Sequence, residues 1–429
     1  MKKNADNKII AVVGLGYVGL PLAFLAEKKG YKVIGTDISS ERVELLNKRS
    51  APFADQEIAE QLKNSSLEAT TDFSRIKDVS VIIICVPTPV YENHVPNLEP
   101  VKSVCRNIAP FLQKGQLVVL ESTVNPGVSE SIVLPILEKE SGLVCGKDFY
   151  LAHCPERINP GDKKWNVGNI NRVVGGFDEI SLQKATEFYK SIISAEIKPM
   201  ASLKEAEAVK IVENTFRDIN IAFANELAMS FSKLGIDVVN VINGAATKPF
   251  AFLAHYPGCG VGGHCIPVDP YYLIEYAREN GFDHDFLSLA RRINSKMPEF
   301  TAELAVSGLN DKKFSINGAK VAVLGLAYKP EIGDYRESPS FKIIKHLERR
   351  GAKVVSFDPF VLHKSTVKTL EEAIAGAQVI IIATAHDAFK KLEPSYLSQN
   401  GVKVVVDGRN CLPKEKFIKA GIIYKGIGR

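Results

Sequence analysis

The stretch PGCGVGGHCIPVDPYYL, residues 257–273, combines a cysteine with dense glycine and a nearby carboxylate. Four glycines precede Cys265, and Asp269 follows it by four residues. Glycine lets the backbone approach a ligand closely, and a cysteine thiolate in such a setting is a candidate nucleophile. The alternative is a flexible loop around an inert buried cysteine. The local sequence alone favours neither interpretation.

A second group of polar side chains lies in EAVKIVENT. Lys210 and Asn214 are four residues apart, so they share one face of a helix. A cation beside an amide donor can stabilise a developing alkoxide or oxyanion. The alternative is an ordinary solvated helix surface.

Three more candidates follow predicted strands. Glu156 and Arg157 stand in HCPERINPGD, and Thr123 stands in ESTVNPG. Ligands of doubly wound sheets bind at the carboxyl ends of the strands. Their positions, as well as their chemistry, therefore favour a role at a site.

The segment GLGYVG, residues 14–19, follows a predicted strand and opens a predicted helix. This is the context that the GxGxxG dinucleotide fingerprint requires. Gly14 permits a tight turn, Gly16 lets the backbone approach a pyrophosphate, and Gly19 allows close packing of helix on strand. The helix N-terminus stabilises the bound phosphates.

Asp37 lies 18 residues after Gly19, at the end of the next predicted strand. Its carboxylate would accept hydrogen bonds from ribose hydroxyls and disfavour a 2′-phosphate, which predicts NAD over NADP. Arg42 lies nearby and would either tolerate a phosphate or stack on adenine.

The elements that must position these residues alternate between strand and helix up to about residue 200. Five runs predict strands: KIIAVVGLG, YKVIGTD, VSVIIICVP, QLVVLEST and RVVGG. The alternation predicts an α/β fold with a doubly wound parallel sheet. A second alternating block begins near Asn317 and predicts a second Rossmann-like domain. Its GLAYKP segment, residues 325–330, lacks the third glycine, which argues against a second NAD.

Between the two blocks, residues 202–234 contain neither Gly nor Pro. This stretch predicts one long amphipathic helix that crosses between domains or lines a dimer interface. The alternative is a long core helix within one domain. Its predicted apolar face consists of Val209, Val212, Phe216, Ile219 and Phe223.

The composition limits the classes of function. The chain has 429 residues, 45% of them hydrophobic and 24% charged, and a net charge of +5. These values predict a soluble globular protein with no nucleic-acid stripe and no membrane span. The seven scattered cysteines show no metal-ligand spacing, so we expect no metal site and a reducing, cytoplasmic location.

Taken together, these motifs resemble the nucleotide-sugar 6-dehydrogenases, the family of UDP-glucose, UDP-N-acetylglucosamine and UDP-N-acetylmannosamine dehydrogenases. The resemblance covers essentially the whole chain and rests on seven motifs in one order. They are GLGYVGLPLA, VPTP, ESTVNPG, PERINPGD, VKIVENT, GVGGHCIPVDPYYL and GLAYKPEIGDYRESP.

The resemblance implies three domains: residues 1–200 binding NAD, 201–308 carrying the cysteine loop and a dimer interface, and 309–429 binding the UDP-sugar. The implied catalytic residues are Cys265, Lys210, Asn214, Asp269, Glu156 and Thr123. The implied cofactor-binding residues are Gly14, Gly16, Tyr17, Val18, Gly19, Asp37, Arg42, Pro87, Thr88 and Thr123. The implied substrate-binding residues are Glu156, Arg157, Lys210, Asn214, Gly262, Lys329 and Arg336.

The resemblance also implies the reaction, a four-electron oxidation of the sugar C6 alcohol to a carboxylate with two NAD. Cys265 would form a thiohemiacetal and then a thioester, which water hydrolyses with Asp269 or Glu156 as general base. The family further implies a homodimer and a role in polysaccharide biosynthesis.

The sugar is the least determined part of the resemblance. UDP-glucose enzymes commonly read GGSC before the nucleophile, whereas this chain reads GGHC. That departure resembles the UDP-N-acetylhexosamine branch, with UDP-N-acetyl-D-glucosamine preferred, and UDP-N-acetyl-D-mannosamine or UDP-glucose as alternatives. Remote alternatives are a two-electron hydroxyacid-type dehydrogenase and a non-catalytic NAD-binding protein.

Overall fold

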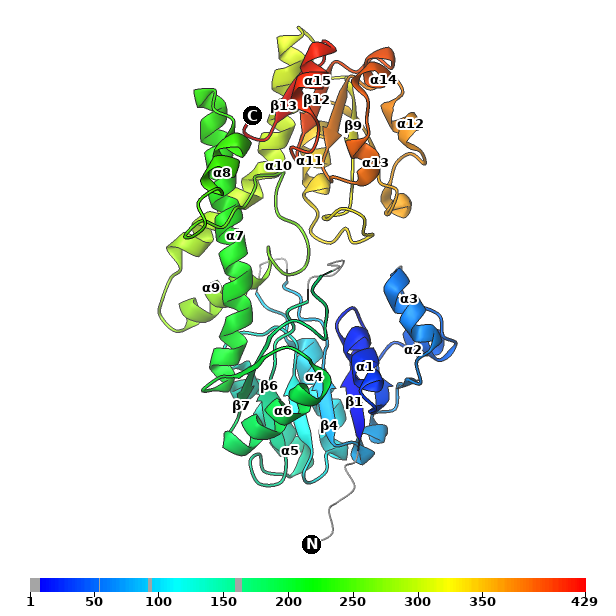
Figure 1. Ribbon diagram of the computed structural model, residues 1–429, viewed down its shortest axis with the longest axis vertical. Helices are drawn as coiled ribbons and strands as arrows, with labels where there is room; N and C mark the ends of the chain where they lie inside the picture. The colour runs from blue at the N-terminus through cyan, green and yellow to red at the C-terminus, as the bar shows by residue number, and fades with distance from the viewer. Residues whose placement is uncertain (1–7, 54, 92–94, 159–163) are drawn as a thin grey trace. The chain divides into compact units, whose positions relative to one another are not determined.

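The computed structural model describes residues 8–53, 55–91, 95–158 and 164–429 (Figure 1). The chain divides into two compact units. The first unit comprises Met1–Glu213 and Tyr271–Phe282, and the second comprises Asn214–Pro270 and Asp283–Arg429. The end of the predicted PERINPGD motif lies outside the described residues.

The sheet of the first unit has the described strand order β3-β2-β1-β4-β5-β6-β7-β8. The strands are β1 Ile9–Val13, β2 Lys32–Thr36, β3 Glu68–Thr70, β4 Val81–Ile84, β5 Leu117–Leu120, β6 Tyr150–His153, β7 Arg172–Gly176 and β8 Ile197–Pro199. Strand β7 runs antiparallel to β6, and the other neighbouring strands pair in parallel. The first six strands have the Rossmann order, which confirms the predicted doubly wound fold.

Helices cover both faces of this sheet, which is why runs such as β4 and β5 are apolar on both sides. Helices α1 Gly19–Lys28 and α6 Glu179–Ile192 build one core cluster with the sheet. Helices α4 Glu99–Ile108 and α5 Leu134–Ser141 build the other. The shorter elements are α2 Ser40–Asn47, α3 Gln56–Lys63, η1 Phe73–Asp78, η2 Ala109–Phe111 and η3 Ser129–Val133.

The sheet of the second unit has the order β10-β9-β11-β12-β13, and all of these pairs are parallel. Its strands are β9 Lys320–Leu324, β10 Lys353–Phe357, β11 Val379–Ile382, β12 Val404–Asp407 and β13 Ile423–Gly426. One core cluster joins it to α10 Asp285–Asp311 and α11 Pro339–Glu348. The opposite cluster includes α12 Leu370–Ile374, α13 Asp387–Lys390, α14 Pro394–Gln399 and α15 Lys414–Lys419.

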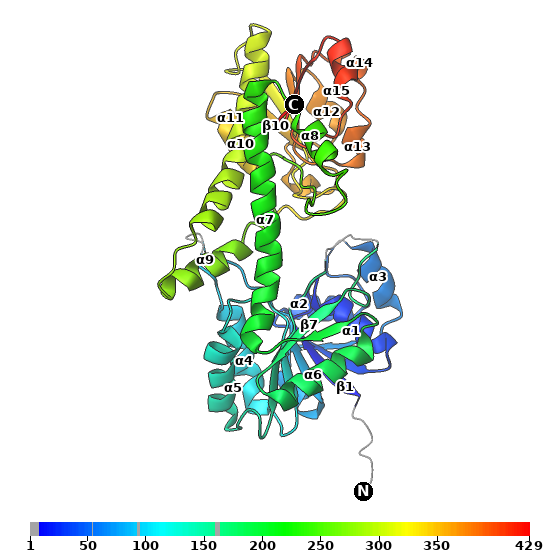
Figure 2. The ribbon, with the colours of Figure 1, turned by 60° about the vertical axis from the view of Figure 1, so that its left-hand side comes forward.

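The predicted long helix is confirmed as α7, Leu203–Leu234, which is unbroken over 32 residues (Figure 2). At 1.5 Å per residue it is about 48 Å long. Its buried positions are largely small or polar, such as Asn214, Asp218 and Asn225. The side predicted to be its apolar face instead exposes Val212, Phe216 and Phe223 by 57%, 47% and 55%.

Two shorter helices flank the cysteine loop, α8 Val238–Ala245 and α9 Asp269–Glu279. Among the helices described here, none is both long and apolar enough to cross a membrane.

Candidate functional site

The glycine turn of the first unit has the geometry that the fingerprint predicts. Gly14 has φ +94° and donates its N–H to the Thr36 carbonyl at 2.8 Å. A Cβ on Gly19 would lie 2.0 Å from the Gly14 carbonyl oxygen, whereas a Cβ on Gly16 would meet nothing within 4 Å. The turn therefore requires glycine for packing at one position and leaves open space for a ligand at the other, which fits a dinucleotide pyrophosphate.

Asp37 lies just past β2 and is 4% exposed. Its carboxylate accepts hydrogen bonds from the Leu15 N–H at 2.9 Å and from the Ser39 N–H at 2.9 Å. The Arg42 guanidinium, 38% exposed, pairs with the same carboxylate at 2.8 Å. This pairing brings the predicted ribose-binding acid and its neighbouring arginine together.

The remaining predicted cofactor residues lie on the turn and on the loops after β4 and β5. Tyr17 is 42% exposed, and its ring centroid lies 4.0 Å from that of Phe53. Val18 precedes α1 as its N-cap. Thr88 is buried and donates its hydroxyl to the Thr123 carbonyl at 2.7 Å, whereas Pro87, in the same loop, is exposed.

Helix α9 enters the first unit next to these loops. The buried Tyr272 side chain donates its hydroxyl to the Thr88 carbonyl oxygen. Asn125 donates its side-chain amide to the Tyr272 carbonyl at 3.2 Å. The loops that carry Thr88 and Thr123 are therefore fixed from α9 as well as from the sheet.

Glu156 and Arg157 follow β6, as predicted. Glu156 is 8% exposed; it accepts the Ile158 N–H and lies 3.5 Å from the buried Arg172 guanidinium. Arg157 is ion-paired with Glu213 of α7. Lys210 lies on α7 and is half-buried.

In the second unit, Cys265 is exposed, whereas five of the other six cysteines are buried. Its carbonyl accepts the N–H groups of Val268 at 3.0 Å and Asp269 at 2.8 Å, where α9 begins. Asp269 is 4% exposed and Asn214 is 5% exposed. The Asn214 amide donates to the Asp269 carboxylate at 2.5 Å, so these two predicted residues are held together.

The loop between β9 and α11 packs on the glycines before Cys265. Gly263 donates its N–H to the Arg336 carbonyl at 3.0 Å. A Cβ on Gly262 would lie 2.7 Å from the Tyr328 Cβ, and one on Gly263 would lie 2.9 Å from the Tyr328 ring. Glycine is required at both positions because Tyr328 lies directly against them.

This packing brings charged and aromatic groups to the cysteine. Burial, with the charge of Asp334 and the thiol of Cys265, raises the pKa of Tyr328 to about 12. Burial and the charge of Arg336 lower the pKa of His264 below its ordinary value, so this imidazole is neutral at pH 7. Arg336 is ion-paired with Asp334 at 2.6 Å, and Lys329 lies half-buried in the same loop.

The predicted catalytic residues thus divide between the units. Thr123, Glu156 and Lys210 belong to the first, whereas Asn214, Cys265 and Asp269 belong to the second. Among the described residues, no three His, Cys, Asp or Glu side chains are grouped to hold a metal ion.

Sequence reasoning missed two residues of these sites. Arg172 is fully buried in β7 beside Glu156, and a charged residue opening the apolar run RVVGG was the available signal. Tyr328 has no distinctive spacing, because its role depends on a loop contact that only the fold creates.

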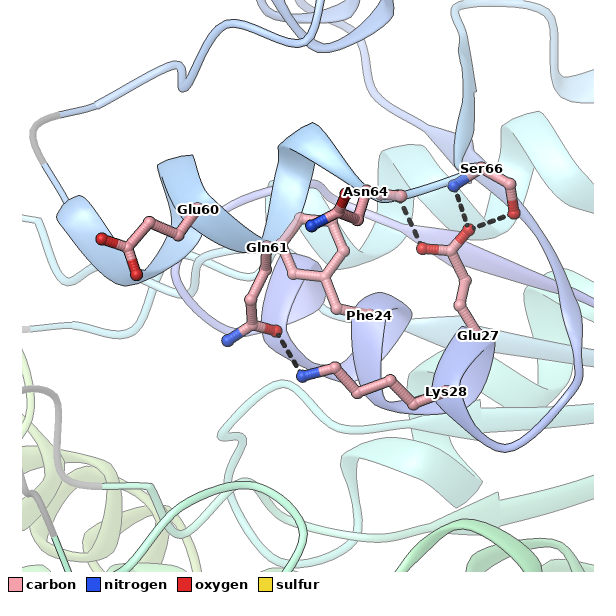
Figure 3. Close-up of a pocket in the computed structure, with 8 residues that line it drawn as sticks. Phe24, Glu27, Lys28, Glu60, Gln61, Asn64 and Ser66 are labelled. Atoms are coloured by element: carbon pink, nitrogen blue, oxygen red, sulfur yellow. Dashed lines mark hydrogen bonds between the residues drawn. The ribbon is translucent and has the colours of Figure 1, made fainter.

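A separate pocket lies between α1 and α3 (Figure 3). Its polar groups contact one another: the Glu27 carboxylate accepts both the Ser65 hydroxyl and the Ser66 N–H, at 2.6 and 2.8 Å. None of the predicted site residues lines it. We assign it no part in the chemistry.

Comparison with known families gives three matches along the chain, all to parts of one family. Residues 8–193 match the NAD binding domain of the UDP-glucose/GDP-mannose dehydrogenase family. Residues 204–296 match its central domain, and residues 322–414 match its UDP binding domain.

Among similar proteins, a UDP-N-acetyl-D-mannosamine dehydrogenase of Pyrococcus horikoshii is 39% identical over 98% of this chain and 99% of its own. A UDP-N-acetyl-D-glucosamine 6-dehydrogenase of Pseudomonas aeruginosa is 38% identical over 95% of this chain and 98% of its own.

Solved structures give the same result. The structure of the P. horikoshii UDP-D-ManNAc dehydrogenase matches with a TM-score of 0.92 at 38% identity, over 98% of this chain and 99% of that one. A UDP-glucose dehydrogenase from Pyrobaculum islandicum matches with a TM-score of 0.86 at 28% identity, over 100% and 99%.

Proposed function

Since the chain belongs to the UDP-glucose/GDP-mannose dehydrogenase family and is an NAD-dependent nucleotide-sugar dehydrogenase, we propose that it oxidises C6 of UDP-N-acetyl-D-glucosamine to the uronate. The observation that carries the proposal is the exposed Cys265 just before α9, whose carbonyl binds the N–H of Asp269, the partner of Asn214. A dehydrogenase that stops at the aldehyde needs no nucleophilic thiol.

In this proposal residues 1–200 bind NAD, 201–308 carry the cysteine loop and 309–429 bind the UDP moiety. When bound, NAD accepts the hydrides that leave C6. The glycine turn would hold its pyrophosphate and Asp37 its ribose, with Tyr17, Pro87 and Thr88 along the same edge of the sheet. The open space at Gly16 supports this assignment.

Side chains of the protein carry out the remaining steps. Lys210 and Asn214 stabilise the C6 alkoxide and later oxyanions. The Cys265 thiolate adds to the aldehyde carbon and forms a thiohemiacetal, whose oxidation leaves a thioester on the same sulfur. Water then attacks the thioester carbonyl, the C–S bond breaks, and the thiolate is regenerated.

We assign the proton of that water to Glu156, with Thr123 holding the water, and we assign to Asp269 the orientation of the Asn214 amide. The hydrogen bond between Asn214 and Asp269 supports this division. Gly262, Lys329 and Arg336 in the second unit, and Arg157 in the first, would contact the UDP-sugar.

UDP-N-acetyl-D-mannosamine is the second candidate, because relatives named for the two sugars are 39% and 38% identical to this chain. The two substrates differ in configuration at C2.

We further propose that the protein is a homodimer in a reducing cytoplasm and supplies a uronate for polysaccharide biosynthesis. The exposed apolar side chains Val212, Phe216 and Phe223 on one helix support the dimer. Sedimentation should give a dimer mass that Phe216→Glu with Phe223→Glu reduces to a monomer.

Seven free cysteines support the reducing location.

The decisive measurement is NADH formed per sugar consumed, with UDP-N-acetylglucosamine, UDP-N-acetylmannosamine and UDP-glucose offered separately. Two NADH per sugar establish the four-electron reaction, and the sugar with the highest kcat/KM identifies the substrate. One NADH per sugar would overturn the thioester route. No turnover on any of the three would overturn the substrate class.

A pair of cysteine variants isolates the nucleophile. We expect Cys265→Ala to abolish uronate formation, with kcat at least about 1,000-fold lower. The matched control is Cys411→Ala, since Cys411 is the other cysteine that is not fully buried. A Cys265→Ala enzyme that still makes uronate at the normal rate would contradict the role of the thiol.

A further inference from the structure

Arg172, the first residue of β7, is fully buried although it is charged. Its guanidinium lies 3.5 Å from the Glu121 carboxylate, 3.5 Å from the Glu156 carboxylate and 3.3 Å from the Pro155 carbonyl. A buried cation costs several kcal/mol unless it is paired. Two carboxylates and a carbonyl offset that cost here.

The Glu121 carboxylate also has a partner on α6. The buried Tyr189 of α6 donates its hydroxyl to Glu121 at 2.5 Å. Glu121 is 1% exposed and follows β5. Glu121 is therefore enclosed by protein on all sides, whereas Glu156 lies in the loop that follows β6.

The buried charges are unequal, with two carboxylates to one guanidinium. Burial raises the pKa of Glu121 to about 7, although Arg172 opposes the rise. Glu121 thus takes up the excess proton near neutral pH. Glu156 is the other carboxylate in contact with the Arg172 guanidinium.

We propose that Arg172 is a positioning residue that orients the Glu156 carboxylate, and that Glu121, held by Tyr189, anchors the same guanidinium from its other side. The inference rests on the proposed function, because it takes Glu156 as the base that receives the proton of the hydrolytic water. Arg172 itself touches no reacting atom in this scheme.

The ionisable groups near Glu156 and Arg172 come from β7, α6, α7 and the segments that follow β4, β5 and β6. They are Cys85, Glu121, Cys154, Arg157, Arg172, Tyr189 and Glu213. Burial raises the pKa values of Cys85 and Cys154, so both remain thiols at neutral pH. Arg157 and Glu213 neutralise each other. The charge that Glu156 experiences is therefore set chiefly by Arg172 and Glu121.

The test is the pH dependence of kcat for uronate formation in the full-length enzyme. The acid limb of this profile is the pH range in which kcat falls as the solution becomes more acidic. Arg172→Met should move the acid limb to higher pH by about one unit or more, because a buried carboxylate without its cation holds its proton more tightly. At a pH below both acid limbs, a shift of one unit corresponds to a kcat about 10-fold lower. Arg172→Lys should restore most of the wild-type position.

Glu121→Gln should not move the acid limb to higher pH. The amide keeps the shape and removes the competing charge, so the acid limb should stay in place or move to lower pH. A merely structural role would reduce the activity of both variants without moving either limb. An Arg172→Met limb that does not move, or a Glu121→Gln limb that moves to higher pH, overturns the inference.

Two controls separate folding from positioning. NAD affinity reports whether the first unit is folded in each variant. Arg291→Gln removes another buried arginine, which pairs with Asp218 in the second unit at 2.6 Å, and its acid limb should remain at the wild-type pH.

A readout without turnover separates this inference from the proposed function. The infrared carboxylate band that Glu156→Gln removes should titrate at higher pH in Arg172→Met than in the wild-type protein. An enzyme inactive on every UDP-sugar would overturn the proposed function. An active enzyme in which the band and the limb stay fixed would overturn only the role of Arg172.

Discussion

The turn after β1 and the turn after β9 begin in the same way and end differently. Gly14 and Gly325 have φ of +94° and +97°. Each donates its N–H to the last carbonyl of the neighbouring strand, at 2.8 and 2.9 Å. The next residue then donates to an aspartate just past that strand, Asp37 in one unit and Asp358 in the other.

The two aspartates differ in what else they bind. Asp37 shares its carboxylate with Arg42, whose side chain is 38% exposed. Asp358 is fully buried; it accepts a second loop N–H, from Ala327 at 2.8 Å, and contacts His386 at 3.1 Å. The first carboxylate is therefore accessible to a ligand once Arg42 moves, whereas the second is enclosed by protein.

The helices that follow the two turns begin at different distances from them. Helix α1 begins at Gly19, directly after its turn, whereas α11 begins only at Pro339. A pyrophosphate binds at a helix N-terminus next to the turn, and the second turn has none. We therefore propose that the first turn binds the dinucleotide, whereas the second turn orders a loop that carries Tyr328 to the cysteine segment.

The largest expected effect tests the first turn. Gly19→Ala should weaken NAD binding at least about 100-fold and lower the free energy of unfolding by about 2 kcal/mol, because the new methyl group overlaps the Gly14 carbonyl. Gly16→Ala is the matched control. Its methyl group meets no protein atom within 4 Å, so stability should hold while NAD binding falls about 10-fold. Calorimetric titration with NAD and urea unfolding measure both quantities.

A smaller effect on NAD binding is expected when the two aspartates are compared. Asp358→Asn should destabilise the protein by about 2–3 kcal/mol, because a buried amide cannot accept all the hydrogen bonds made to the carboxylate. Asp37→Asn should cost about 1 kcal/mol and instead weaken NAD binding about 10-fold. Urea unfolding of both variants measures the loss of stability, and NAD titration measures the loss of affinity. Equal losses of stability would show that the two carboxylates have the same role.

Periodicity and motif spacing predicted much of this architecture. Both sheets, the glycine turn and α7 follow from local patterns, since β-branched runs, glycine spacing and a long stretch without glycine or proline constrain the backbone directly. No predicted strand run covers the short β3, β6, β8 or β13. Three or four residues carry too little pattern to stand out.

Contacts between distant segments could not be predicted in this way. The Tyr328 ring against Gly263 and the Arg172 guanidinium beside Glu156 depend on tertiary packing that no local spacing encodes. The outward orientation of Phe216 is a further example. Its helical periodicity predicts an apolar face, and whether that face lies in the core depends on what packs against the opposite side.

The smallest effect compares Glu207 with Asp358, two buried carboxylates that accept two and three backbone N–H groups, respectively. Glu207 binds Gly127 and Ser129, and burial raises its pKa to about 7 despite these bonds. Burial also opposes ionisation of Asp358, but the hydrogen bonds from His386 and the backbone prevail and lower its pKa below 3.8.

The two groups therefore impose opposite pH dependences. A raised folded-state pKa means that the stability contributed by Glu207 is complete below its unfolded-state pKa and is lost as the pH rises through about 7. Relative to Glu207→Gln, the wild-type protein should lose about 1 kcal/mol between pH 6 and pH 8. A lowered pKa means that the contribution of Asp358 is present above its unfolded-state pKa and is lost in acid.

Amide hydrogen exchange measures both, because it reports local free energies of opening. Protection of residues 124–134 should fall from pH 6 to pH 8 in the wild-type protein and stay level in Glu207→Gln, after correction for the intrinsic rate. Protection of residues 325–338 should not change over that range in either protein. A parallel change in both segments would contradict the opposite pH dependences expected for Glu207 and Asp358.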